Sequence, residues 1–239
     1  MINLQFLDWD SNFFGFPIGQ ILINKKTDYT SGLLSNLLVK ARDKNIKLVY
    51  LILPERDSFI SIPKFENNIR LVDKKVYYQT EIVLNHTQDK HISSYKANTI
   101  NNDMYELALS SGEYSRFKVD PDFPDEECKN LFKKWIENSI NKTYADEVLV
   151  YQSKNKILGM VTLSIKKNSG NIGLIAVNQQ YQGQHIGHKL INASKHYFKQ
   201  KGIKDLTVTT QSNNFNACRF YEKNDFYIKK INHIYHCWL

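Results

Sequence analysis

Long apolar runs, cysteine and arginine are scarce in this chain of 239 residues. The longest apolar run is the six-residue stretch 48–53, counting its tyrosine, whereas a membrane-spanning helix needs about 18–20 apolar residues. The sequence therefore excludes a membrane protein. The first 24 residues contain Asp8 and Asp10 but no Lys or Arg, so they lack the basic region that opens a secretory signal. We expect a cytoplasmic protein with no membrane partner.

The three cysteines are Cys128, Cys218 and Cys237. An odd number at wide spacing suits neither a disulfide framework nor a C-x-x-C metal-binding pair. We expect three ordinary thiols and no metal site.

The formal net charge is +8, from 32 Lys and Arg against 24 Asp and Glu. These cations are scattered in ones and twos, without the dense patch or reading motif that favours nucleic acid as a partner. The excess lies beyond residue 90, where 20 cations face 14 anions, compared with 12 and 10 before it. We expect no nucleic-acid partner, and the balance is compatible with an anionic small molecule.

The N-terminal part alternates strand and helix. Apolar residues at helical spacing predict a helix over 31–45, with Ser31 as a possible N-cap. Strands are predicted at 18–23, 47–53, 76–78 and 81–84. Residues 85–102 are polar and their apolar residues show no sustained period, so we expect a linker there. We place the domain boundary near residue 93, which divides the chain into units 1–93 and 94–239.

The C-terminal part combines amphipathic helices with short strands. The clearest helix is 126–140, whose apolar residues share one face. Further helices are predicted at 103–111, 188–201 and 216–224, and strands at 147–152, 157–165, 171–177, 206–210 and, as a broken pair, 226–238. Together the two parts predict an α/β protein.

The strand 171–177 runs through a glycine-containing loop, 178–187, directly into a helix. Such a loop presents unpaired backbone N–H groups and the positive end of the helix dipole to one point, which favours an anion such as a pyrophosphate. It is neither a Walker A loop nor G-x-G-x-x-G. Taken alone, it is equally typical of a tight strand-to-helix connection.

A second motif, N-x-x-A-x-x-x-Y-E-K, begins at Asn214. With the first loop it resembles the GNAT superfamily of acyl-CoA-dependent N-acyltransferases over roughly residues 94–239. The resemblance implies a mixed, mostly antiparallel sheet flanked by helices, here preceded by a smaller α/β domain. It also implies acyl-CoA as co-substrate, with the residues Ile175, Ala176, Val177, Gln182, Gly183, Gln184, His185, Ile186, Gly187, His188, Asn214 and Ala217 binding it.

Tyr221 lies in the second motif. The resemblance implies that it is the general acid, because a phenol with a pKa of about 10 is protonated at neutral pH and can donate to a leaving thiolate. The alternative is a core tyrosine that packs the last helix on the sheet. The general base is open, with Glu113 and His185 as possible but weak candidates.

Two positions depart from the family pattern. His185 replaces the middle glycine of the loop, and we expect a backbone there that is compatible with the right-handed helical region, or a slightly different placement of CoA. Asp225 replaces a glycine before Phe226, and aspartate tolerates the left-handed region better than most residues.

The opening segment 7–15 and the segments 115–117 and 135–138 resemble the TDP-fucosamine acetyltransferase branch of this superfamily. The branch implies a dTDP-linked amino-dideoxyhexose as acceptor, acetyl-CoA or 3-hydroxybutyryl-CoA as donor, and a homodimer. The implied substrate-binding residues are Trp9, Phe13, Phe14, Gly15, Ser115, Arg116 and Phe117. Arg116 equally suits a surface salt bridge, and the aromatic cluster a core.

Two other functions stay open at this point. One is a GNAT enzyme for another amine, such as a protein N-terminus, a polyamine or an antibiotic. The other is an acyl-CoA sensor without turnover.

Overall fold

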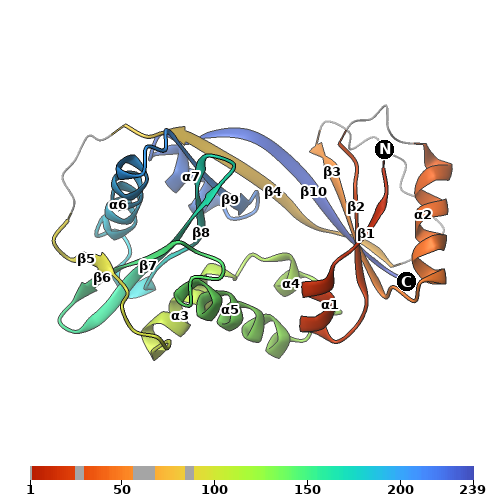
Figure 1. The fold of residues 1–239 in the computed structure, drawn as a ribbon, viewed down its shortest axis with the longest axis horizontal. Coiled ribbons are helices and arrows are strands. Elements are labelled where there is room, and N and C mark those ends of the chain that lie inside the picture. The colour runs from red at the N-terminus through yellow and green to blue at the C-terminus, as the bar shows by residue number, and fades with distance from the viewer. Residues whose placement is uncertain (1, 25–29, 56–67, 84–88) are drawn as a thin grey trace.

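The computed structural model describes residues 2–24, 30–55, 68–83 and 89–239. In these ranges ten strands form one sheet in the order β1-β2-β3-β10-β4-β9-β8-β7-β6-β5 (Figure 1). The elements are β1 (Leu4–Phe6), α1 (Asp8–Phe14), β2 (Ile18–Leu22), α2 (Ser31–Asp43), β3 (Leu48–Pro54), β4 (Ile69–Glu81), β5 (Ile92–Ser94), α3 (Asn102–Ser111), α4 (Arg116–Val119), α5 (Asp125–Ile140), β6 (Glu147–Ser153), β7 (Lys156–Lys166), β8 (Ser169–Val177), α6 (Ile186–Gln200), β9 (Asp205–Gln211), α7 (Phe215–Glu222) and β10 (Tyr227–Trp238). The predicted mixed, mostly antiparallel fold is confirmed: only β2–β3 and β8–β9 are parallel pairs.

The two long strands β4 and β10 join the N-terminal part to the rest of the sheet (Figure 1). The second half of β10 pairs with β3, and β4 lies between β10 and β9. β4 is one strand of 13 residues where two short ones were predicted, and β10 is continuous where a break was predicted at 231–232. Leu84, at the end of the second predicted strand, lies outside the described residues.

The predicted linker contains β5, and the predicted boundary at residue 93 lies inside that strand. The N-terminal strands β2 and β3 pack with α2 around a separate apolar cluster. The helix α2 is capped by Thr30 rather than Ser31: the Thr30 hydroxyl accepts a hydrogen bond from the Leu33 amide. How the chain divides into units stays a prediction.

Helices cover both faces of the strands β6 to β8. α6 packs on one face, where Leu190 shares a cluster with Val161, and α3 packs on the other, where Met104 shares a cluster with Met160. Figure 1 shows α6 on the opposite side of these strands from α3 and α5. Within the described ranges, no helix combines the length and the apolar character that a membrane crossing requires.

The sheet opens between β8 and β9. These parallel strands pair only at Gly170, Asn171 and Ile172, after which β8 continues to Val177 without β9. A β-bulge in β8 begins the separation, and Gly173 lies in it. A Cβ atom at Gly173 would lie 2.7 Å from Thr162 Oγ1, the atom that accepts the Leu174 amide at 2.8 Å. Glycine is therefore required where the two strands diverge.

Candidate active site

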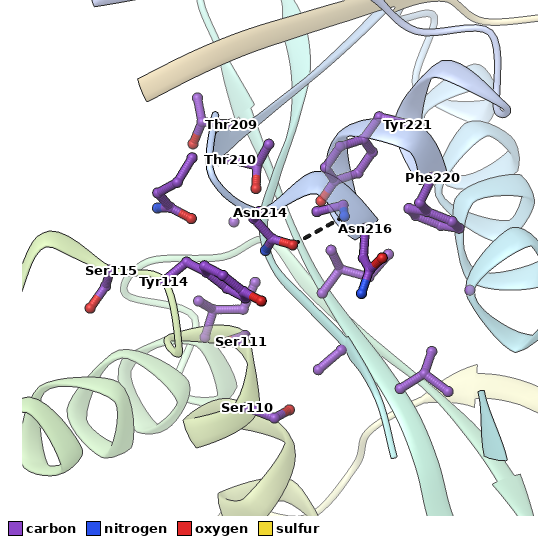
Figure 2. Close-up of a pocket in the computed structure, with 18 of the residues that line it drawn as sticks. Ser110, Ser111, Tyr114, Ser115, Thr209, Thr210, Asn214, Asn216, Phe220 and Tyr221 are labelled. Carbon is purple, nitrogen blue, oxygen red and sulfur yellow. Dashed lines mark hydrogen bonds between the residues drawn. The ribbon is translucent and has the colours of Figure 1, made fainter. Parts of the chain in front are cut away.

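A cavity of about 1180 Å³ lies at the opening between β8 and β9. Its lining includes the diverging edge of β8 (173–177), the start of α6, the end of β9 and the helix α7. It continues to α1, α4, α5 and β4. In Figure 2, Ser110, Ser111, Tyr114 and Ser115 stand on one side of this space and Thr209, Thr210, Asn214 and Tyr221 on the other. Unpaired backbone groups on the β8 edge can bind an extended ligand arm as an added strand would.

The loop before α6 turns through two left-handed residues. Gly183 has φ of +78° and His185, the N-cap residue, has φ of +59°. The expectation of a right-handed backbone at His185 is therefore wrong: histidine is one of the residues enriched in the left-handed region, and it adopts this conformation at the turn that begins α6. The first turn of α6 contains no acidic residue, and its residues line the cavity, an arrangement that favours an anion.

Gly187 allows α6 and α7 to approach closely. A Cβ atom there would lie 3.0 Å from the ring of Phe220. Beside it, His188 Nδ1 and Asn224 Oδ1 are 2.6 Å apart, and the Asn224 amide donates to the Phe220 carbonyl at 2.7 Å. These contacts fix the loop before α6 against α7.

The second motif builds α7 and orients Tyr221. Asn214 Oδ1 accepts the Ala217 amide at 3.1 Å, the bond dashed in Figure 2, so both residues serve the helix N-terminus as well as lining the cavity. Tyr221 lines the cavity and is 4% exposed. Burial, with a smaller contribution from Cys218, raises its pKa, so the phenol stays protonated at neutral pH. Asp225 has φ of +67°, in the left-handed region that aspartate tolerates better than most residues.

The other end of the cavity is aromatic and charged. The Arg116 guanidinium lies over the rings of Tyr50, at 4.2 Å, and Phe117, at 4.6 Å, which holds it by cation–π contact. Trp9 also lines the cavity, and Phe13 stacks behind it with ring centroids 5.2 Å apart.

Asp120 fixes the end of α4, and with it Arg116, to β10. Its Oδ2 atom lies 2.6 Å from His236 Nδ1 and accepts the Trp238 indole N–H at 3.0 Å. Burial opposes the charge of Asp120, but these hydrogen bonds outweigh it and lower the pKa to about 2. Burial lowers the pKa of His236 to about 4, so this histidine is neutral at pH 7.

Most of the predicted site residues meet in this one cavity. Those in the lining are Trp9, Ser115, Arg116, Phe117, Ile175, Ala176, Val177, Gln182, Gly183, His185, Ile186, Gly187, His188, Asn214, Ala217 and Tyr221. Four predicted residues are not part of it: Phe13, Phe14, Gly15 and Gln184. Phe14 is buried among Phe117 and Phe123, and Gly15 ends α1 with φ of +74°. The aromatic cluster of the opening segment is thus partly core.

Four charged residues in the lining were missed: Asp10, Asp73, Lys75 and Lys223. Burial raises the pKa of Asp10, with Arg116 opposing. Burial also raises the pKa of Asp73 to about 6, with Lys75 and Arg116 opposing, and lowers that of Lys75 to about 8. For Asp73 and Lys75 the only signal in the sequence is their spacing of two, which places them on one face of a strand. However, the three consecutive charged residues at 73–75 look like a turn.

Across the described residues, no group of three or more His, Cys, Asp and Glu side chains is placed to hold a metal ion.

Known proteins resemble the chain in sequence and fold. The model of the "Acetyltransferase (GNAT) family" matches residues 102–226. The "Spore coat polysaccharide biosynthesis protein SpsD" of Bacillus subtilis (strain 168) is 28% identical over 134 residues, 56% of this chain and 46% of that protein. The "N-alpha-acetyltransferase 30" of Schizosaccharomyces pombe is 35% identical over 57 residues, 24% of this chain and 38% of that protein. The chain thus spans less than half the length of these curated relatives.

Solved structures agree on the fold. The GCN5-related N-acetyltransferase from Sphaerobacter thermophilus superposes with a TM-score of 0.57 at 12% identity, covering 92% of this chain and 72% of that one. The family model matches more than half of the chain, which confirms the family membership predicted from the two motifs. The chain belongs to the GNAT acetyltransferase family, whose members transfer an acyl group from acyl-CoA to an amine.

Proposed function

We propose that this enzyme transfers an acyl group from acyl-CoA to the amino group of a dTDP-linked amino-dideoxyhexose for a surface polysaccharide. The observation that supports this proposal most strongly is the cavity, which extends from the loop before α6 to Arg116 and Trp9. Its volume of about 1180 Å³ exceeds the ~300–1,000 Å³ of a typical single-ligand pocket, which supports two substrates side by side. The name of the relative SpsD, a spore coat polysaccharide biosynthesis protein, supports a product used in polysaccharide synthesis.

In this proposal the two ends of the cavity have separate tasks. The amides of 183–188 bind the CoA diphosphate, and the edge 173–177 of β8 binds the pantetheine arm, with one N–H polarising the thioester carbonyl. Arg116 binds an oxyanion of the sugar nucleotide and Trp9 stacks on its base or sugar. Tyr221 donates its proton to the departing thiolate. The acyl group is acetyl or 3-hydroxybutyryl, and the enzyme works as a cytoplasmic homodimer.

The test is release of free CoA thiol over a matrix of acyl-CoAs and acceptors. The acceptors are dTDP-amino-dideoxyhexoses, the matching dTDP-sugars without an amine, a polyamine and a peptide with a free N-terminus. The proposal expects thiol release only with the dTDP-aminosugars, and a product whose mass rises by the acyl group. Turnover of the peptide or polyamine, with none of any nucleotide sugar, would assign a different acceptor to the same CoA site.

A further inference from the structure

β4 places a buried carboxylate in the cavity. Asp73 is 7% exposed and lines the cavity together with Lys75, two residues further along the strand. Side chains two apart share one face of a strand, so both project opposite to Val76 and Tyr78, which pack in the cluster of α6 and Tyr221. The loop proposed to bind the CoA diphosphate leads into α6. Asp73 therefore meets the opening of the sheet from the face opposite to the CoA diphosphate site.

One oxygen of this carboxylate has no protein partner. Asp73 Oδ1 is fully buried and accepts no hydrogen bond from any residue that the structure describes. A buried carboxylate oxygen without a donor is costly, and in native proteins it commonly marks a place where a ligand or water supplies the missing donor. Because Asp73 lines the substrate cavity, that donor is expected on a substrate.

Several charged groups surround the carboxylate. Lys75 and Tyr77 lie on the same face of β4, and Arg116 comes from α4. Lys166 from β7 and Lys230 from β10 act on the neighbouring Lys75. Of these, Lys75 and Arg116 favour ionised Asp73, but burial is the larger effect and raises its pKa to about 6. At pH 7 the group is mostly a carboxylate that can still accept a proton.

Asp10 is the one other carboxylate in the lining. It interacts with Arg116 and with Tyr50, which places it in the compartment of the arginine. The two candidates that the sequence offered are placed less well: Glu113 is exposed and outside the lining, and His185 is exposed in the loop before α6.

We propose that Asp73 binds the ammonium group of the acceptor and removes the proton that blocks its lone pair. The ammonium transfers one proton to the Asp73 carboxylate, which later releases it to solvent. The neutral nitrogen then attacks the thioester carbonyl carbon, a C–N bond forms and the C–S bond breaks. Tyr221 gives its proton to the CoA sulfur and regains one from the positively charged nitrogen, so that amide and free thiol are the products. This role rests on the acyltransferase activity of the family and not on the identity of the sugar.

The test compares wild type, Asp73→Asn and the control Asp43→Asn, which changes an exposed carboxylate at the end of α2. The measured quantity is kcat/KM for whichever amine the matrix above identifies, from pH 5 to 9, together with the Kd of acyl-CoA. Wild type and control should lose activity as pH falls through about 6. Asp73→Asn should lose about 10²–10⁴-fold in kcat/KM at pH 7 with the Kd for acyl-CoA unchanged. A change below threefold in Asp73→Asn, with the acidic limb retained, would overturn the proposal.

A neutral nucleophile separates a base from a structural residue. O-Methylhydroxylamine has a neutral nitrogen at pH 7, so Asp73→Asn should acylate it nearly as fast as wild type does. An equal loss with both nucleophiles would argue against a base.

If no amine in the matrix is turned over, the proposed acceptor fails while Asp73 can still be tested. An infrared titration of the wild-type carboxyl groups, with the Asp73 band assigned by its absence in Asp73→Asn or, if that variant does not fold, Asp73→Ser, should give a midpoint near 6. A midpoint below 4 would overturn the role of Asp73.

Discussion

Replacing Asp73 by asparagine should stabilise the protein at the pH where it impairs catalysis. The carboxylate is buried in β4, one oxygen has no partner among the described residues, and burial raises its pKa from 3.8 to about 6. Asparagine has nearly the same shape and no charge. The variant therefore removes the cost of keeping this ion buried.

The magnitude follows from linkage between protonation and folding. Below pH 3.8 both the folded and the unfolded chain hold the proton, so Asp73 carries no penalty. Between pH 3.8 and about 6 only the folded chain holds it, and the penalty grows as pH rises. Above about pH 6 the penalty is constant. Raising the pKa of Asp73 from 3.8 to about 6 corresponds to a loss of roughly 3 kcal/mol in the free energy of unfolding.

The assay is urea unfolding of wild type, Asp73→Asn and Asp43→Asn at intervals from pH 4 to 8. Subtracting wild type from each variant removes the contributions of all other titrating groups. Asp73→Asn should be more stable by up to roughly 3 kcal/mol at pH 8, with the difference falling toward zero at pH 4. Asp43→Asn should show no such trend. A difference for Asp73→Asn that is independent of pH, or a variant less stable at pH 8 than at pH 4 relative to wild type, would refute the reasoning.

Other perturbations test separate parts of the site. Tyr221→Phe should lower kcat about 10²–10⁴-fold with an unchanged Kd for acyl-CoA, and an unchanged kcat in stopped-flow thiol release would remove the proposed acid. Arg116→Ala should raise KM for the acceptor at least about tenfold and leave KM for acyl-CoA alone, because a charge-assisted hydrogen bond contributes about 1.5–3 kcal/mol. Gly187→Ala places a Cβ 3.0 Å from the Phe220 ring and should weaken CoA binding by calorimetry; equal affinity would show that the two helices can separate freely. As pH falls from 6.5 to about 4, His236 should bind a proton in the unfolded chain but not in the folded one, where it is buried. The free energy of unfolding of wild type, measured in urea, should therefore fall by roughly 3 kcal/mol relative to that of His236→Gln. Free energies of the two proteins that change in parallel with pH would contradict the low pKa of His236.

The strand, loop and helix proposed to bind the CoA diphosphate could be predicted from the sequence because they are local. The strand, loop and helix around residues 171–188 are consecutive, so their order alone places the amides at one point. The left-handed backbone of His185 was not predicted, since residues other than glycine adopt it uncommonly and only the observed turn shows it.

The end of the cavity proposed to bind the acceptor is assembled from distant segments, so the resemblance indicated Trp9 and Arg116 there but the residue pattern gave no sign of Asp10 or Asp73. Asp10 comes from α1, Asp73 from β4 and Arg116 from α4, and they line one cavity only in the folded chain. The charges at 73–75 interrupt the apolar pattern of β4, so the sequence indicated a short strand after them and no carboxylate in a cavity. Charged residues in the middle of a sheet are rare unless they are paired or functional, and this rule applies only once the strand is known.

The most direct test of the account is a crystal structure of the protein soaked with coenzyme A at millimolar concentration. The account predicts the diphosphate at the amides of 183–188, the pantetheine arm along 173–177 between β8 and β9, and the sulfur on the side of Tyr221. Coenzyme bound anywhere else, or an empty opening between β8 and β9 at that concentration, would contradict it.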